Sequence, residues 1–223
     1  MKHLTLIANK NCTDKGTSYR EAHGFTEIYE DYIKKFIGKH PRILEIGIEN
    51  GGSLKMWNDY FLGDCEIYAI DILPEKKMFE TENTHIFIQD QGSREDWENF
   101  KAQVGCGCKD FFDIILDDGS HFPEHQMITL YELCDCVKKD GGIYILEDLH
   151  SNISKDVFFL DGRSYEDTPL FSLVFKEYSP FLSEPENAFL FSKLNDVYLY
   201  SFHNYSGSIK NRSVTSIINF KEN

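Results

Sequence analysis

Short apolar runs alternate with amphipathic stretches along most of this chain, and that alternation restricts the fold more than any other feature. Between residues 42 and 146 it predicts five strands, most of them separated by a helix. The predicted strands cover residues 42–48, 66–72, 85–89, 112–116 and 143–146. The predicted helices cover residues 25–36, 53–61, 95–104 and 123–137. Strands that alternate with helices are typical of a parallel α/β sheet.

The C-terminal part predicts two further strands. Residues 196–203 have the composition of a strand, and residues 205–212 are expected to return antiparallel to it through a tight turn near Asn204. We therefore expect an α/β fold, a doubly wound sheet of about seven mostly parallel strands with an antiparallel last strand. The predicted organisation is an N-terminal helical segment and candidate lid at 1–38, a single domain at 39–212 and a tail at 213–223.

Length and charge limit the classes of partner. The 223 residues are 41% hydrophobic and 14% aromatic, enough to bury the core of one domain. The net charge of -14 repels phosphate, so we expect neither nucleic acid nor an anionic membrane as a partner. No apolar stretch is long enough to span a membrane, and residues 1–8 are too short for a signal-peptide core. We expect a cytoplasmic protein without membrane insertion, and the sequence leaves homo-oligomerisation open.

Six cysteines include two close pairs, Cys106 with Cys108 and Cys134 with Cys136. Zinc thiolates usually have about two to four residues between them, and only one residue separates the members of each pair here. Cys134 also lies on the apolar stripe of the helix predicted at 123–137. Buried thiols are the favoured interpretation, with a zinc site as the alternative.

A glycine-rich turn follows the first strand. It contains Glu45, Gly47 and Gly51, and glycines at such a turn let the backbone approach a ligand closely. The third glycine of the GxGxxG fingerprint is absent, which argues against a dinucleotide pyrophosphate, and the acidic residue favours a cationic ligand. Asp71 ends the second strand, about two dozen residues downstream, where a carboxylate can bind ribose hydroxyls.

Acidic clusters follow the fourth and fifth strands, Asp117-Asp118 and Glu147-Asp148. Neighbouring parallel strands end at one edge of a sheet, so Asp118, Glu147 and Asp148 are expected to converge there. Three crowded carboxylates are costly without a cation, and oxygen ligands favour Mg²⁺. Asp117 points to the opposite face from Asp118 and is expected to face the cofactor. His121, three residues after Asp118, is the candidate base.

The acidic strand end, the glycine turn and Asp71, in that order, resemble the class I S-adenosylmethionine-dependent methyltransferases over residues 40–150. A longer set resembles the macrolide-sugar and rhamnosyl O-methyltransferases, the family of the mycinamicin and macrocin enzymes. This set is Thr13-Asp14-Lys15, His23, Trp57, Asp90-Gln91, Asp118-Gly119-Ser120-His121 and Glu147-Asp148. The chain lacks room for the large N-terminal domain of the mycinamicin enzyme, which leaves the substrate and the oligomeric state open.

The resemblance implies a Rossmann-like fold and methyl transfer from S-adenosylmethionine to a sugar hydroxyl. The acceptor sugar would be nucleotide-linked, part of a glycan or part of a glycosylated natural product. The implied cofactor residues are Glu45, Gly47, Gly51 and Asp71, with Asp90 and Gln91 close to the adenine. The implied Mg²⁺ ligands are Asp118, Glu147 and Asp148, and the implied catalytic base is His121.

Other interpretations stay open. The acceptor could instead be a catechol-like phenol, and the chain could be a non-catalytic nucleotide- or glycan-binding domain or a nicotinamide oxidoreductase. Taken singly, the acids could form turns or cap a helix, and His121 could be structural. Trp57 is expected in the core, and residues 151–212 are expected to determine acceptor specificity.

Overall fold

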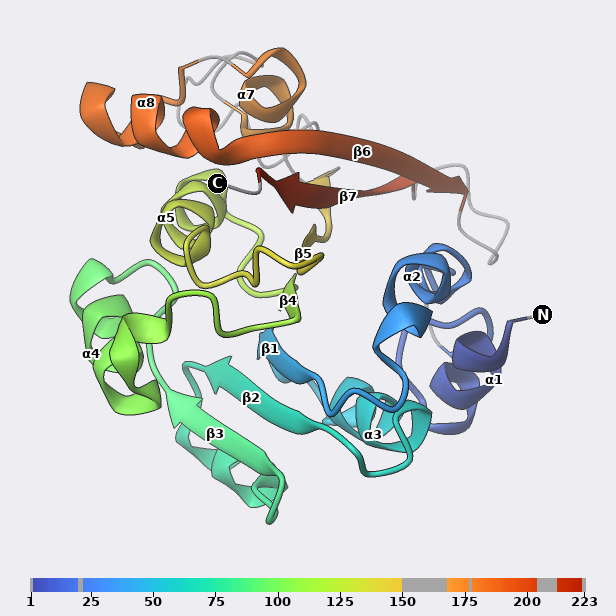
Figure 1. The fold of residues 1–223 in the computed structure, drawn as a ribbon. Helices are drawn as coiled ribbons and strands as arrows, with labels where there is room; N and C mark the ends of the chain where they lie inside the picture. The colour runs from blue at the N-terminus through green and yellow to red at the C-terminus, as the bar shows by residue number, and fades with distance from the viewer. Residues whose placement is uncertain (1, 20–21, 150–167, 177, 204–211, 222–223) are drawn as a thin grey trace.

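The computed structural model describes residues 2–19, 22–149, 168–176, 178–203 and 212–221. Within these ranges seven strands form one sheet with the order β3-β2-β1-β4-β5-β7-β6 (Figure 1). The strands are β1 Arg42–Ile46, β2 Glu66–Asp71, β3 Thr84–Ile88, β4 Ile114–Asp117, β5 Ile143–Leu146, β6 Leu194–His203 and β7 Arg212–Phe220. The first five are parallel, and β7 is antiparallel to both β5 and β6. The predicted fold class is confirmed.

Helices cover both faces of the sheet (Figure 1). Alternate residues of β1 enter two separate cores: Ile43 belongs to the same buried cluster as Trp57, and Leu44 to the same cluster as Phe100. One layer contains α1 His3–Lys10, α2 Thr26–Ile33 and α3 Gly52–Tyr60. The other layer contains α4 Arg94–Val104, α5 Pro123–Leu133, α7 Pro169–Phe175 and α8 Glu184–Lys193. Short 3-10 helices are η1 Lys34–Phe36, η2 Pro74–Phe79 and η3 Cys106–Cys108. Trp57 is fully buried, as predicted.

The tail predicted at 213–223 is wrong, because most of it is β7. This strand lies between β5 and β6, with Tyr144 opposite Ile218 and Leu146 opposite Ser216. Ile217 and Ile218 are fully buried, one in each core. The returning strand thus begins near the end of the range predicted for it, and residues 204–211 lie outside the described part of the chain. Burial on both sides makes two adjacent isoleucines favourable, a pattern that alternation does not detect.

The N-terminal segment shares the core of the sheet. Leu4 and Ala8 of α1 and Tyr29 and Ile33 of α2 are all fully buried in the cluster that contains Trp57. The boundary predicted at residue 38 therefore does not separate two packing units. The two helices lie on the same side of the sheet as α3 and belong to the same domain (Figure 1).

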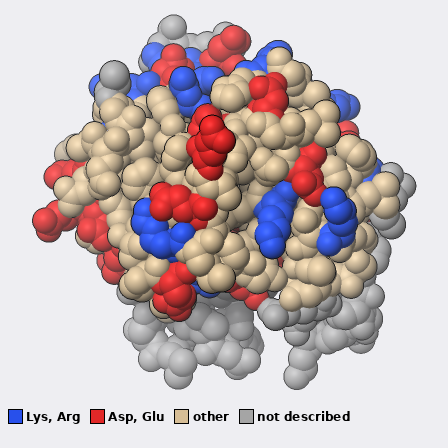
Figure 2. Space-filling view, turned by 90° about the horizontal axis from the view of Figure 1, so that it is seen from below, with Lys and Arg blue, Asp and Glu red and all other residues tan. Residues whose placement is uncertain are grey.

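Charged side chains of both signs are mixed on the surface seen from below, where Lys and Arg lie next to Asp and Glu (Figure 2). That face has no continuous basic surface among its described residues. In the same described part of the chain, none of the helices has the length and hydropathy that a bilayer crossing requires. Of the segment expected to determine acceptor specificity, residues 151–167 lie outside the described ranges.

Candidate active site

The registers of β1, β4 and β5 bring three strand ends together. Ile46 lies opposite Asp117, and Asp117 lies opposite Leu146, so the residues that follow are neighbours at the same edge. Gly47 has a φ of 93°, and a Cβ atom there would overlap the carbonyl oxygen of Asp118. Only glycine combines this backbone conformation with such a close approach of two loops. The predicted convergence at the sheet edge is therefore present in the structure.

Two cavities open at this edge. The first, which we call the acidic cavity, has a volume of about 260 Å³ and includes Asp118, His121 and Asp148 in its lining. The second, the apolar cavity, has a volume of about 330 Å³ and is lined by Ile46, Ile70, Ile72 and Phe122 among others. Both cavities share the lining residues Gly47, Asp71 and Gly119. A single elongated ligand can therefore occupy both cavities.

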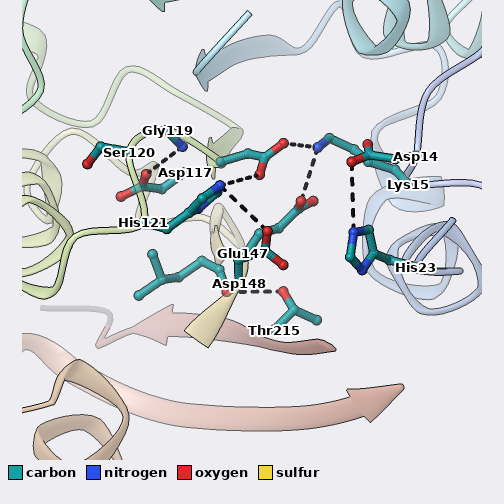
Figure 3. Close-up of polar contacts among 12 residues, drawn as sticks. Asp14, Lys15, His23, Asp117, Gly119, Ser120, His121, Glu147, Asp148 and Thr215 are labelled. Carbon is teal, nitrogen blue, oxygen red and sulfur yellow. Dashed lines mark hydrogen bonds and ion pairs between the residues drawn. The ribbon is translucent and has the colours of Figure 1, made fainter. Parts of the chain in front are cut away.

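Asp118, His121 and Asp148 all line the acidic cavity, and Figure 3 shows His121 directed toward Asp148. His121 Nε2 lies 3.9 Å from Asp118 Oδ1 and 3.5 Å from Asp148 Oδ2. Among the described residues, these three are the one group of His, Cys, Asp or Glu side chains whose ligand atoms all lie within 4.8 Å of one another. His121 and Asp148 also have positive φ angles, of 58° and 55°. Such strained backbone is typical of sites where side chains are held for function.

Glu147, the third predicted metal ligand, is adjacent but faces another way. Its Oε2 accepts a hydrogen bond from Lys15 Nζ at 3.0 Å, and its Oε1 accepts one from the Tyr29 hydroxyl at 2.6 Å. The Tyr29 hydroxyl also lies 3.3 Å from Thr215 Oγ1. Both carboxylate oxygens of Glu147 thus have partners within the protein, and its role as a metal ligand stays a prediction.

Lys15 lies in the site, although the Thr13-Asp14-Lys15 motif alone predicted no role for it. It lies on the loop between α1 and α2, is 1% exposed, and its ammonium contacts both Asp118 and Glu147 (Figure 3). Burial alone would lower the pKa of Lys15, but the neighbouring carboxylates of Asp118 and Glu147 raise it well above its usual value. Lys15 therefore carries a positive charge inside the protein.

The carboxyl groups around Lys15 influence each other's pKa. Burial raises the pKa of Glu147 well above its usual value, and the charge of Asp118 raises it further. The pKa of Asp118 is lowered, because the charges of Lys15 and His121 outweigh the effect of burial. The raised pKa of Glu147 reflects both its burial and its repulsion from Asp118 and Asp148, which is the electrostatic condition that favours a further cation.

The glycine turn contributes to the acidic cavity. Glu45 lines it, and its carboxylate accepts hydrogen bonds from Ser53 Oγ and, at 2.8 Å, from Trp57 Nε1. Burial raises the pKa of Glu45 to about 7, against the opposing effect of Lys15. Gly51, with a φ of 71°, is the N-cap of α3 and shapes the turn.

Asp71 lies at the border of the two cavities, as expected for a residue that contacts a ribose. Its Oδ2 accepts a hydrogen bond from the Ile48 amide at 2.8 Å, and its Oδ1 accepts one from the Leu73 amide at 2.9 Å. These bonds fix the carboxylate at the end of β2, where it lines both cavities. The role of Asp71 in binding ribose hydroxyls stays a prediction.

The remaining predicted cofactor residues lie around the apolar cavity. Asp90 and Gln91 both line it. The Gln91 side chain donates to Asp117 Oδ1 at 2.7 Å and accepts from the Ser120 amide at 2.9 Å. Asp117 is buried and also accepts a hydrogen bond from the Tyr144 hydroxyl at 3.0 Å. Asp117 is not among the described lining residues of either cavity and contacts the lining residue Gln91, so its role toward the cofactor stays a prediction.

Ser120, Phe122 and His125 are among the lining residues of the apolar cavity that were not predicted as site residues. His125 Nδ1 lies 2.8 Å from Ser120 Oγ, and its ring is nearly perpendicular to that of Phe122, with 5.4 Å between the centroids. Phe122 is 55% exposed. The available sequence signal was its position, an aromatic residue between an acidic strand end and Pro123 at the start of a predicted helix.

Known proteins with related sequences are sugar O-methyltransferases. The chain is 35% identical over 153 residues to the 8-demethyl-8-(2-methoxy-alpha-L-rhamnosyl)-tetracenomycin-C 3'-O-methyltransferase of Streptomyces olivaceus, a match that covers 66% of this chain and 36% of the relative. It is 34% identical over 134 residues to the demethylmacrocin O-methyltransferase of Streptomyces fradiae, covering 57% of this chain and 32% of the relative. The matches thus span about a third of the length of these curated relatives. No protein-family model matches the chain.

The fold comparison gives a concordant result. The structure of the MycE methyltransferase from the mycinamycin biosynthetic pathway, in complex with Mg and SAH, superposes with a TM-score of 0.75. The match covers 99% of this chain and 55% of that one, at 22% identity. The resemblance that the motifs indicated is therefore confirmed: the chain is similar in sequence to the macrolide-sugar and rhamnosyl O-methyltransferases, and it has the Rossmann-like methyltransferase fold.

Proposed function

We propose that this chain transfers the methyl group of S-adenosylmethionine to a hydroxyl group of a sugar, with a divalent cation, Mg²⁺, at the acidic cavity. The observation that carries the proposal is the group of Asp118, His121 and Asp148. This group lines the acidic cavity beside the Gly47 turn, and the acidic cavity borders the apolar cavity. Sequence similarity to sugar O-methyltransferases supports the reaction class.

The two cavities suit the two ends of S-adenosylmethionine. The apolar cavity, with Phe122 and the Asp90-Gln91 pair, suits an adenine, and Asp71 at the border suits ribose hydroxyls. The acidic cavity, which includes Glu45, suits the cationic methionine end. Gly47 and Gly119 line both cavities, while Gly51 shapes the turn.

The donor atoms fit a hard divalent cation. Oxygen atoms of Asp118 and Asp148 lie close enough together to share an ion, and Glu147 stands directly behind them. Carboxylate oxygens are the ligands that Mg²⁺ prefers. We assign these three acids to the cation, which when bound would make the accepting hydroxyl more acidic.

We assign His121 as the base that accepts the proton of the sugar hydroxyl. Its Nε2 points into the acidic cavity and lies 3.5 Å from Asp148 Oδ2, a carboxylate that stabilises the imidazolium once the proton has arrived (Figure 3). The sugar oxygen then attacks the sulfonium methyl group in line.

Acceptor and compartment are the finer parts of the proposal. We expect a sugar that is nucleotide-linked, part of a glycan or part of a glycosylated natural product, consistent with the relatives' printed names. We place the reaction in the cytoplasm, where the buried thiols of Cys65, Cys108 and Cys136 stay reduced.

Formation of S-adenosylhomocysteine tests the proposal. After titration calorimetry with S-adenosylmethionine and with NADH, the purified chain is incubated with S-adenosylmethionine and, in turn, a nucleotide-linked rhamnose, a rhamnosylated polyketide and a dihydroxybenzoate, each with and without EDTA. We expect product with a glycoside, its loss in EDTA and its recovery with excess Mg²⁺. Turnover of the dihydroxybenzoate alone would indicate a phenol acceptor. Binding of S-adenosylmethionine without any product would indicate a binding domain, and binding of NADH alone would contradict the methyltransferase class.

A further inference from the structure

Lys15 brings one fixed positive charge into a cavity that is otherwise acidic. The lining of the acidic cavity contains a single Lys or Arg among the described residues, Lys15. The acids in that lining are Asp14, Glu45, Glu49, Asp71, Asp118 and Asp148. We propose that Lys15 is an internal counter-cation that holds Asp118 and Glu147 in place and sets how tightly the acidic cavity binds a divalent cation. This inference rests on the metal site of the proposed function.

The position of Lys15 is fixed through its backbone. Its carbonyl oxygen accepts hydrogen bonds from the Thr26 amide and the Thr26 hydroxyl, both at 3.1 Å. Its amide lies 3.4 Å from Thr13 Oγ1. Because hydrogen bonds hold both the carbonyl oxygen and the amide of Lys15, and because the residue is 1% exposed, the ammonium has little freedom to leave the two carboxylates. Thr26 thus ties the start of α2 to the acidic cavity.

Glu147 is held from both sides. Lys15 bonds one of its oxygens and Tyr29 the other, and the Tyr29 hydroxyl lies against Thr215 of β7. The Thr215 hydroxyl donates in turn to the Leu146 carbonyl oxygen at 3.1 Å. This network joins α2, β5, β7 and the Lys15 loop, and Figure 3 shows its members Lys15, Glu147 and Thr215. If Lys15 lost its charge, Glu147 would keep its bond to Tyr29 but would lose the cation that offsets its repulsion from Asp118.

The ammonium has two opposing effects. Without a divalent cation it compensates carboxylates that would otherwise repel each other, so the cavity is stable when empty. When a divalent cation enters, the same ammonium repels it and shares Asp118 and Glu147 with it. Lys15 is therefore a positioning residue that makes cation binding weaker but allows the site to be formed beforehand.

Mn²⁺ titrations combined with thermal melts of the whole chain distinguish this role from simple packing. The variants are Lys15→Met, which keeps length and apolar volume, and Lys15→Arg, which keeps the charge. Lys10→Met is the matched control, because Lys10 forms an exposed ion pair with Asp59. Mn²⁺ affinity is measured by electron paramagnetic resonance, Tm is measured in EDTA and in saturating Mn²⁺, and S-adenosylmethionine binding is measured in parallel.

We expect Lys15→Met to have a lower Tm in EDTA, to bind Mn²⁺ at least about fivefold more tightly than the unchanged chain, and to gain more Tm from Mn²⁺. Lys15→Arg and Lys10→Met should stay within about twofold of the unchanged chain in Mn²⁺ affinity. If Lys15→Met does not fold in EDTA, its folding should be restored by Mn²⁺. A folded Lys15→Met with equal or weaker Mn²⁺ affinity would overturn the inference, and so would an unfolded one that Mn²⁺ does not rescue.

The same measurements separate this inference from the proposed function. If the unchanged chain binds neither S-adenosylmethionine nor Mn²⁺, the proposed function fails. If the unchanged chain binds both and Lys15→Met behaves identically, only the role of Lys15 fails. If Mn²⁺ binds to Lys15→Met alone, Lys15 replaces the metal ion in the natural chain; the inference then holds and the metal part of the proposed function does not.

Discussion

The acidic cavity and the apolar cavity share a border but obtain their properties from different parts of the chain. The acidic cavity depends on contacts between distant segments, such as that between Lys15 and Glu147. The apolar cavity is lined by strand ends and by the start of α5, with Phe122 and His125 close in sequence. The apolar cavity therefore follows from the sheet topology, whereas the acidic cavity also requires the N-terminal segment.

The largest effect is expected from Asp118→Asn, which changes the acidic cavity and leaves the apolar one intact. Asp118 contacts Lys15 and lies 3.9 Å from His121, so its loss removes a proposed metal ligand and the partner of an internal cation. We expect turnover to fall by about 10³-fold or more, with binding of S-adenosylmethionine within a few-fold of the unchanged chain. Turnover is measured as S-adenosylhomocysteine formation and binding by calorimetry. Asp140→Asn, at an exposed position, is the control, and a joint loss of cofactor binding and folding would mark Asp118 as structural.

His121→Gln tests proton transfer within the same cavity. Loss of a general base costs about 10²- to 10⁴-fold in rate, so we expect a fall in kcat of about this size with little change in KM. Steady-state kinetics over the acceptor concentration give both constants. His85→Gln is the matched control, since His85 has an ion pair with Glu66 at the far edge of the sheet. A near-normal kcat in His121→Gln would exclude His121 as the base.

Gly47→Ala should damage both cavities at their common border. The new methyl group would overlap the Asp118 carbonyl oxygen at a φ of 93°. We expect affinity for S-adenosylmethionine to fall by at least about tenfold and Tm to fall as well. Gly63→Ala separates the causes, because Gly63 has a φ of 77° with no atom within 4 Å of an added Cβ. Equal effects in the two variants would show that backbone strain, and not the contact between the loops, is responsible.

The convergence of the acids could be predicted from the sequence, because the acids directly follow two strands and neighbouring parallel strands end at the same edge of a sheet. The sequence also predicted that Asp117 and Asp118 face opposite ways, since alternation along β4 requires it. It did not show that Asp117 would be buried under Tyr144, because that depends on which residues of β5 lie opposite β4. The range of β7 was predicted wrongly, with residues 213–220 assigned to a tail, for a related reason: its two adjacent buried isoleucines depend on helices that cover both faces.

The role of Lys15 could not be obtained from local patterns. Its contacts with Asp118 and Glu147 join residues that are 103 and 132 positions apart in the chain. A lysine between a threonine-aspartate pair and a glycine is, by composition alone, an exposed loop residue. Only the packing of α1 and α2 against the sheet brings the ammonium to the strand ends. The motif was therefore noticed without its function being assigned.

Phe122→Ala changes the apolar cavity without adding or removing a charge. Phe122 is 55% exposed and lines the cavity, so its ring becomes covered only when a ligand is present. We expect affinity for S-adenosylmethionine to fall by roughly three- to tenfold, in line with the loss of one aromatic contact, and Tm to stay unchanged. Phe175→Ala, which removes an exposed ring from α7, is the control. Unchanged affinity in Phe122→Ala would place the adenine elsewhere.

The smallest effect is expected at Asp117, as a change in the pH dependence of stability. Burial raises its pKa to about 7, whereas an unfolded aspartate titrates near its usual value of about 4. Between these two values the folded chain binds a proton that the unfolded chain has released, so the free energy of unfolding decreases as pH rises from about 4 to about 7. Asp117→Asn removes this titration and should flatten the slope by up to about 1.4 kcal/mol per pH unit. Urea unfolding between pH 5 and 6.5 measures it, with Asp140→Asn as the control. Parallel profiles would show that the carboxylate stays ionised in the core, held by Gln91 and Tyr144, and that the support behind the apolar cavity is charged at every working pH.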